Sequence, residues 1–272
     1  MSRRAPGKVL HVLSGCRYAR CGSRRSQVTR MKLVLLRHTP DPDLLVALAA
    51  RRCYSCRTAE AIEERLGETE IDQLLEKLRL RNHLSPFEHV TFTFSVDGVS
   101  RALSHQLVRH RIASYSQESQ RYVEYTKLRE LPYVVPPTVA ANPEAAKRFA
   151  AVTEEALKGY RELLELGVPA EDARYLFPNA VETKLVYTMN ARSLFNFFEQ
   201  RCCRKAQWEI RILAEAMLRE VRKVAPRIFR HAGSPCHDRE RPYCRENDQT
   251  CPNYKLVERY LKARCSAFED PA

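Results

Sequence analysis

The stretch Arg109–Tyr122 reads RHRIASYSQESQRY and is an unusually dense run of cations and hydrogen-bond donors. Arginine binds phosphate bidentately, and Ser and Gln side chains can complete the oxygen shell or contact the edge of a base. A solvated basic surface normally mixes Lys with acidic residues, whereas this stretch interleaves Arg with Ser and Gln. The composition therefore favours a binding site for a nucleotide-sized anion.

The residues before this stretch predict that it begins on a helix. Residues 100–112 have apolar side chains at helical spacing, and such a helix would carry Gln106, Arg109 and His110 on one face. The remainder of the stretch contains no Gly, so an extended path is expected there. The donors would then approach one ligand from two adjoining elements.

The charge of the whole chain is less informative than it first looks. The 272 residues carry a net charge of +13, but residues 1–30 contain eight Lys or Arg and no Asp or Glu. Subtracting those eight charges leaves +5 for residues 31–272, which suits a small anionic ligand at least as well as a duplex. No run approaches the roughly 20 apolar residues of a membrane span.

The chain divides by composition into three parts. Residues 1–30 form a basic extension, interpreted as a disordered tail, a transit-like peptide or sequence upstream of the true start. Residues 31–230 alternate strand and helix patterns without repeats and predict one α+β domain. Residues 231–272 form a Cys-rich tail. Predicted helices include residues 42–66, 142–166, 191–200, 206–224 and 254–263, with strands near residues 32–36, 89–96 and 181–188.

Ten cysteines do not define a clear framework. Cys53 and Cys56 form a CxxC, but inside the predicted helix 42–66. Cys236, Cys244 and Cys251 have spacings unlike common zinc modules. A chain of this size needs no disulfides, so a reducing cytoplasm is expected, with a metal or disulfide in the tail left as an alternative.

RHRIASYSQESQRY resembles the signature RHRxxSxNxxSxRY of flavin-dependent thymidylate synthases. Ser116 stands where the signature has Asn, which puts one flavin contact in doubt. Ser85–His89 (SPFEH) resembles a second family segment, and residues 190–210 resemble its C-terminal half. The similarity covers roughly residues 31–229 and leaves out the arm and the tail. Within the signature the matching residues are Arg109, His110, Arg111, Ser114, Ser119, Arg121 and Tyr122.

This resemblance implies an α+β homotetramer whose active sites form between subunits. It implies conversion of dUMP to dTMP, with a methylene group from 5,10-methylenetetrahydrofolate and a hydride from FAD that NADPH has reduced. Residues expected at dUMP are Gln106, Arg109, Gln117, Glu118, Ser119, Gln120, Arg121, Arg174 and Arg201. Residues expected at FAD are Ser85, Arg109, His110, Arg111, Gln117, Asn190, Arg192 and Asn196.

Arg201 matches the family position that would activate the base, because a cation at the pyrimidine edge stabilises the anion formed there. A helix C-terminal cation is its structural alternative. Arg174 would reach dUMP from a neighbouring subunit, or could be salt-bridged in its own helix. His83 and Glu88 are expected near the flavin and folate, and Lys205 stands where family members can have His.

Several of these residues also have structural interpretations. Ser85 and Glu88 fit a capping box at a helix start. Asn190 and Asn196 lie near another predicted helix start, where amide side chains often act as caps.

Three other functions are possible on residues alone. A cysteine-dependent synthase would need a nucleophilic thiol, for which Cys202 and Cys203 beside Arg201 are the candidates. A nucleic-acid-binding protein could use the basic arm and stacking tyrosines. A structural zinc protein could use the tail cysteines with His231 or His237. No GxGxxG is present, so a Rossmann site for FAD or NADPH is not expected.

Overall fold

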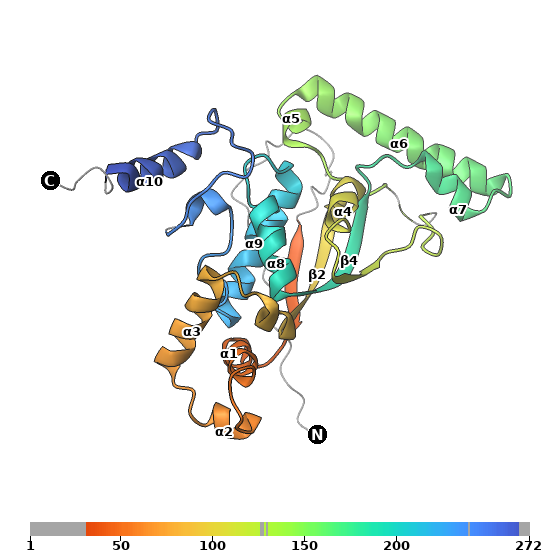
Figure 1. Ribbon diagram of the computed structural model, residues 1–272. Coiled ribbons are helices and arrows are strands. Elements are labelled where there is room, and N and C mark those ends of the chain that lie inside the picture. Colours follow the sequence, from red (N-terminus) through yellow and green to blue (C-terminus); the bar gives the residue numbers. More distant parts are fainter. Residues whose placement is uncertain (1–30, 126–127, 129, 239, 267–272) are drawn as a thin grey trace. The chain divides into compact units, whose positions relative to one another are not determined.

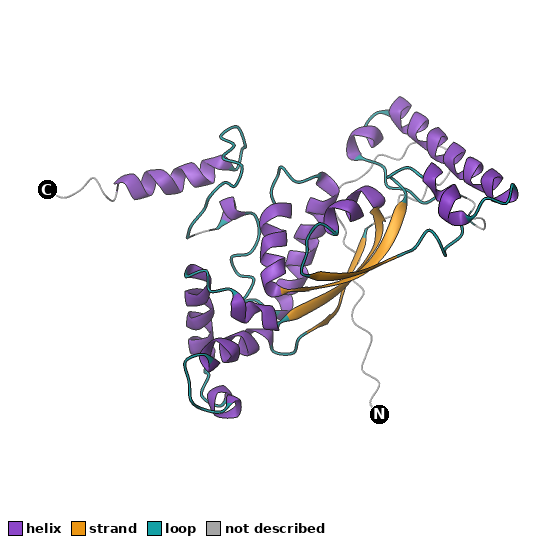
Figure 2. Ribbon diagram, turned by 45° about the vertical axis from the view of Figure 1, so that its right-hand side comes forward, coloured by secondary structure: helices purple, strands orange, loops and turns teal. Residues whose placement is uncertain are grey.

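A computed structural model describes residues 31–125, 128, 130–238 and 240–266 (Figures 1 and 2). The predicted extension over residues 1–30 lies outside the described residues. Contacts between residues divide the described chain into two compact units. The first unit contains residues 31–36 and 93–188, and the second contains residues 37–92 and 189–266. Each is described separately below.

Four strands form one sheet in the order β1-β2-β4-β3. The Thr93 and Thr188 hydroxyls lie 2.9 Å apart and mark the register of β2 against β4. Phe92, Phe94 and Val96 alternate along β2 and are fully buried, which confirms the predicted half-buried strand. This sheet and the helices of the described chain confirm the α+β class. The strands are β1 (Lys32–His38), β2 (Thr91–Ser100), β3 (Ala113–Gln117) and β4 (Glu182–Asn190).

The longest helix of the first unit, α6, has both of the predicted ends. The Asn142 side chain accepts hydrogen bonds from two backbone N–H groups of the first turn, and Gly167 follows the helix with φ of 86°. Tyr125, Tyr160 and Phe177 pack together under it, edge to face or tilted. The helical elements are α4 (Arg101–Leu107), α5 (Pro137–Ala140), α6 (Pro143–Glu165), α7 (Ala170–Ala173) and the 3-10 turn η2 (Arg174–Leu176).

The second unit is mainly helical, and an aromatic core joins its parts. Phe229 packs edge to face against Phe92, Phe195 and Phe198. Its elements are α1 (Pro42–Arg52), α2 (Ala59–Glu63), α3 (Glu68–Leu80), η1 (Ser85–His89), α8 (Ala191–Arg201), α9 (Trp208–Val224), η3 (Pro235–His237) and α10 (Tyr254–Ser266). None of the described helices has the length and apolar character needed to cross a membrane.

The single helix predicted over residues 42–66 is wrong. The chain turns after Arg52 and restarts at α2, where the Thr58 hydroxyl accepts the backbone N–H of Ala61 as an N-cap. Cys53 and Cys56 lie at this break, and both are exposed. A cap residue within an otherwise helical pattern was the local signal for the break.

Candidate active site

The arginine-rich stretch lies in the first unit, and its helix is shorter than predicted. α4 ends at Leu107, and Ile112, in the segment between α4 and β3, adopts a positive φ of 62°. The Tyr115 hydroxyl donates to the carbonyls of Leu107 (2.9 Å) and His110 (2.8 Å), which satisfies groups left open by the helix end. Burial raises the pKa of Tyr115, so the hydroxyl remains a donor.

The predicted common face of Gln106, Arg109 and His110 is therefore wrong. Arg109 and His110 lie beyond the helix; Arg109 is exposed and His110 is 6% exposed. Gln106 stays on α4 and its amide donates to the Ala102 carbonyl at 3.4 Å. Within the part of the chain that the structure describes, the Arg109 and Arg111 guanidinium groups form no ion pair, so both can bind an anion.

The extended path predicted after the helix is confirmed for Ala113–Gln117 and ends there. Ser116 is exposed on this strand. Ser119 begins a turn instead: its carbonyl accepts the Val123 N–H at 2.9 Å and its Oγ accepts the Arg121 N–H at 3.3 Å. Ser119 and Arg121 are thus placed by a turn rather than by strand alternation.

Gln117, which is half-buried, and Gln120, which is buried, are the two amide side chains at the end of β3. Gln117 Nε2 donates to the hydroxyls of Ser104 (3.0 Å) and Thr183 (3.1 Å), which fixes its orientation. Gln120 is 9% exposed, and its Nε2 has no hydrogen-bond partner among the described residues. An unsatisfied buried donor is costly, so a ligand acceptor or an ordered water would stabilise this position.

Glu118 anchors the strand end rather than presenting a free carboxylate. Its Oε1 accepts from the Tyr125 hydroxyl and its Oε2 pairs with Lys184 Nζ, both at 2.8 Å. The Glu118 carbonyl also accepts from Arg101 Nη2 at 2.8 Å. Burial raises the pKa of Tyr125, and its hydrogen bond to Glu118 adds to the shift.

Two predicted phosphate ligands meet at one residue, Glu171 of α7. Arg121 Nε pairs with the Glu171 carboxylate at 2.7 Å, and Arg174 Nε donates to the Glu171 carbonyl at 2.9 Å. The alternative in which Arg174 forms a salt bridge in its own helix is therefore wrong, because Arg174 contacts the backbone carbonyl of Glu171 and not its carboxylate. Arg121 is 51% exposed and Glu171 47% exposed, so solvent weakens their ion pair.

Arg101 joins this group, although nothing in its local sequence singles it out. Burial lowers the pKa of Arg101, and the charge of Arg174 acts in the same direction against the opposing effects of Tyr125 and Glu118. Its Nε is buried without a hydrogen-bond partner among the described residues. Three guanidinium groups, those of Arg101, Arg121 and Arg174, thus gather in the first unit.

Three residues predicted to bind the flavin, Asn190, Arg192 and Asn196, lie in the second unit at the end of β4 and in α8. Asn190 caps α8, as one interpretation predicted, by accepting the Ser193 N–H at 2.8 Å. Asn196 does not cap a helix: its Oδ1 accepts from Gln200 Nε2 at 2.8 Å. Arg192, on the first turn of α8, is ion-paired with Glu88 of η1.

The predicted capping box at Ser85 is wrong. Leu84 precedes the 3-10 turn η1, and no side chain caps this turn. Ser85 and His83 are exposed, and Glu88 uses its carboxylate on Arg192. His83, Ser85 and Glu88 are thus all exposed on the short segment before β2.

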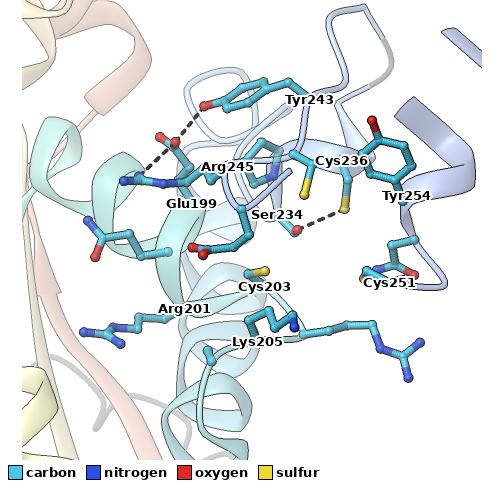
Figure 3. A pocket seen from close by; sticks show the side chains of 17 residues that line it. Glu199, Arg201, Cys203, Lys205, Ser234, Cys236, Tyr243, Arg245, Cys251 and Tyr254 are labelled. Atoms are coloured by element: carbon cyan, nitrogen blue, oxygen red, sulfur yellow. Dashed lines mark hydrogen bonds and ion pairs between the residues drawn. The ribbon is translucent and has the colours of Figure 1, made fainter. Parts of the chain in front are cut away.

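Arg201 is the last residue of α8, which agrees with its interpretation as a helix C-terminal cation. It also lines a cavity of about 200 Å³ together with residues of the tail (Figure 3). Burial lowers its pKa from the ordinary value. A partly desolvated guanidinium is still charged at neutral pH and interacts more strongly with an anion than an exposed one does.

The chain is similar to known proteins over most of its length. The family model described as "Thymidylate synthase complementing protein" matches residues 34–227. A protein of Geobacter sulfurreducens named flavin-dependent thymidylate synthase is 49% identical over 232 residues, covering 85% of this chain and 98% of the relative. Proteins of the same name from Clostridium tetani and Nitratidesulfovibrio vulgaris are 46% and 44% identical, covering 78% and 84% of this chain and 90% and 97% of those relatives.

The chain belongs to the flavin-dependent thymidylate synthase family. The residues that the family resemblance assigned to dUMP fall mostly in the first unit, where Arg121 and Arg174 meet at Glu171 of α7, and Glu118 contacts Tyr125 and Arg101. Arg201 lies in the second unit. Arg101 was missed because its burial and its neighbours follow from tertiary packing.

The residues assigned to FAD suit the flavin synthase family in their chemistry. Among the described residues Arg109 and Arg111 are cations without an ion-pair partner, and Ser85 is an exposed hydroxyl. Asn190 and Asn196 accept hydrogen bonds through their side-chain oxygens, which leaves their amide N–H groups for a ligand.

Proposed function

We propose that this chain is a flavin-dependent thymidylate synthase that converts dUMP to dTMP. In this reaction 5,10-methylenetetrahydrofolate supplies the carbon, and FAD reduced by NADPH supplies the hydride. The observation that carries the proposal is that Arg101, Arg121 and Arg174 lie in one unit with the buried amide donor of Gln120, and that Arg121 and Gln120 belong to the segment with the family's signature.

The dUMP phosphate is assigned to Arg121 and Arg174, with Arg101 as an added cation. The exposed Glu171 carboxylate is a weak partner for Arg121, and a phosphate dianion can displace it because it offers more charge and more acceptor oxygens. Gln120 supplies a buried amide donor that lacks a partner among the described residues. The remaining polar contacts are assigned to Gln106, Arg109, Gln117, Glu118 and Ser119.

Arg201 is assigned the activation of the base. Uracil C5 is a poor nucleophile, and attack from C5 becomes easier when negative charge on the ring is stabilised. A partly buried guanidinium at the pyrimidine edge provides that stabilisation because the low local dielectric strengthens its field. Arg201 remains protonated throughout and acts as an electrostatic group.

FAD is assigned to Ser85, Arg109, His110, Arg111, Gln117, Asn190, Arg192 and Asn196, with His83 and Glu88 at the flavin and folate site. The flavin supplies the hydride when it is bound. The protein residues bind and orient it: Arg109 and Arg111 offer charge for the pyrophosphate, and Arg192 is positioned by its ion pair with Glu88.

A homotetramer with shared active sites completes the proposal: Arg174, together with Arg121 of the same chain, would bind the phosphate of a dUMP whose base lies at Arg201 of a neighbouring subunit. The exposed Arg109 and Arg111 support this, because unpaired cations on a site-bearing segment can be covered by a second chain. We also propose a cytoplasmic location, where dTMP is needed; the free described cysteines suit a reducing compartment.

The colour of the purified full-length protein tests the proposal cheaply. A yellow preparation, or one that becomes yellow on addition of FAD, should show flavin absorbance that NADPH bleaches. Protein that binds no FAD under any of these conditions would rule the proposal out. A matched Arg109→Ala variant should retain less flavin, while a change at exposed Arg57, which lies outside every assigned site, should not.

A further inference from the structure

Four cysteines line the cavity at the end of α8, although they are far apart in the sequence. Cys203 follows α8, Cys236 lies in η3, and Cys244 and Cys251 lie in the segment before α10. All four are free thiols with half-buried side chains. The cavity has a volume of about 200 Å³. Figure 3 shows Cys203, Cys236 and Cys251 among the side chains that line it.

Polar contacts hold the Cys-rich tail against this helix end. Glu199 of α8 accepts a hydrogen bond from the Tyr243 hydroxyl at 2.6 Å and pairs with Arg245 at 3.0 Å, on either side of Cys244. Lys205 pairs with Asp248 at 2.8 Å. The cysteines therefore meet in a built cavity, not through a chance approach of a loose tail.

The charge of the lining suits thiolates. Four cations stand against three carboxylates, Glu199 and Glu246 in the lining and Asp248 paired with Lys205, so the surroundings keep a small excess of positive charge. Positive surroundings favour the thiolate, which is the form that binds metal. The cations are Arg201, Arg204, Lys205 and Arg245.

The spacing of the sulfurs argues against a single zinc ion. Tetrahedral zinc with bonds of about 2.3 Å needs sulfurs roughly 3.8 Å apart. Glu76, His231 and Glu240 have ligand atoms within 4.8 Å of one another. Among the described residues this is the one such group of three or more His, Cys, Asp or Glu side chains. No three of the four sulfurs are that close, and no two of these cysteines form the CxxC pair common in zinc sites.

We propose that Cys203, Cys236, Cys244 and Cys251 bind a [4Fe–4S] cluster. Ligand sulfurs on such a cubane lie roughly 6 Å apart, and four cysteine thiolates are its usual ligand set. The histidines considered as tail ligands are not needed: His231 faces Glu76 at 3.4 Å, and neither His231 nor His237 lines the cavity. Three of the four cysteines lie beyond the residues matched by the family model. Arg201 lines the same cavity, but the metal and sulfide content that tests the cluster does not depend on its assignment to base activation.

Iron and acid-labile sulfide in full-length protein purified without oxygen test this proposal directly. We expect about four iron and four sulfide per chain, and a Mössbauer spectrum of a cubane cluster. FAD contains neither iron nor sulfide, so the result does not depend on flavin binding. Stoichiometric zinc without sulfide, protein without metal, or disulfides among the four cysteines in protein kept anaerobic would each overturn the proposal.

Single Cys→Ser variants then assign the ligands. Cys203→Ser, Cys236→Ser, Cys244→Ser and Cys251→Ser should each lose at least half of the iron and sulfide. Cys53→Ser and Cys56→Ser serve as matched controls, because both residues lie in the turn after α1, outside the cavity. Circular dichroism checks that each variant is folded. Folded cavity variants with full cluster content would contradict the assignment.

Discussion

At the scale of single residues, Arg201 carries the claim about base activation. Arg201→Ala should lower the rate of dTMP formation by about 100–1,000-fold, because a preorganised charge is lost where negative charge develops. Oxidation of NADPH by the flavin should continue, since it does not need an activated base. Arg204→Ala, an exposed neighbour, is the matched control and should stay near wild-type turnover. Equal loss of both half-reactions in Arg201→Ala would reassign this residue to binding.

Arg121 tests which residues bind the phosphate. Arg121→Ala should weaken dUMP binding by about 10–100-fold, because charge-assisted hydrogen bonds contribute about 1.5–3 kcal/mol. Binding of deoxyuridine, which has no phosphate, should hardly change. Glu171→Gln removes the competing carboxylate and should leave dUMP binding unchanged or slightly tighter. Isothermal titration separates these cases, and equal losses for dUMP and deoxyuridine would argue against a phosphate contact.

Cys202 tests the alternative of a cysteine nucleophile. Burial raises its pKa to about 12, so it stays a neutral thiol at physiological pH and reacts slowly. Iodoacetamide at pH 8 should therefore modify the exposed Cys53 and Cys56 well before Cys202, as measured by peptide mass spectrometry. Turnover in Cys202→Ala should be retained within a few-fold. Rapid alkylation of Cys202 with loss of activity would restore the nucleophile hypothesis.

At the scale of elements, the sequence predicted helix ends best where neighbouring residues determine them. The cap of α6 at Asn142 and its end at Gly167 are properties of a few neighbouring residues, and both are confirmed. The length of α4 could not be predicted in the same way. Tyr115 sets its end by reaching back to two carbonyls, and the positive φ of Ile112 has no local glycine to announce it.

The α6 cap gives an element-scale prediction. Asn142→Ala should destabilise the protein by about 1 kcal/mol, because two N–H groups of the first turn lose their acceptor. Asn142→Asp keeps an acceptor and should cost only a few tenths of a kcal/mol. Urea unfolding followed by circular dichroism measures the difference. Equal stability of the alanine variant and the wild type would show that water replaces the cap without cost.

At the scale of the whole molecule, the site combines residues that sequence could and could not identify. The signature residues were recognisable because their types and spacing are fixed by chemistry. The network joining Arg101, Glu171 and Arg174 depends on the packing of α7 and the start of α4, which no local pattern encodes. The sequence identified Cys236, Cys244 and Cys251 as a group in the tail. That Cys203 lines the same cavity could be recognised only from the structure.

Subunit sharing can be tested by complementation between two inactive variants. If Arg174 serves a neighbouring subunit, mixed tetramers of Arg174→Ala and Arg201→Ala should contain some intact sites. Mixing after mild dissociation should recover roughly a quarter of the wild-type activity, as expected for random pairing in a symmetric oligomer. No recovery, with mixed tetramers demonstrated by native mass spectrometry, would place both arginines in one chain's site.

The central claim concerns the source of the hydride, and the folate product reports it. Full-length protein with dUMP, 5,10-methylenetetrahydrofolate, NADPH and FAD should form dTMP and tetrahydrofolate in equal amounts, because the flavin supplies the hydride and the folate is not oxidised. Flavin-free protein assayed without added FAD should form no dTMP. Formation of dihydrofolate with dTMP, or dTMP formation without flavin, would contradict the account.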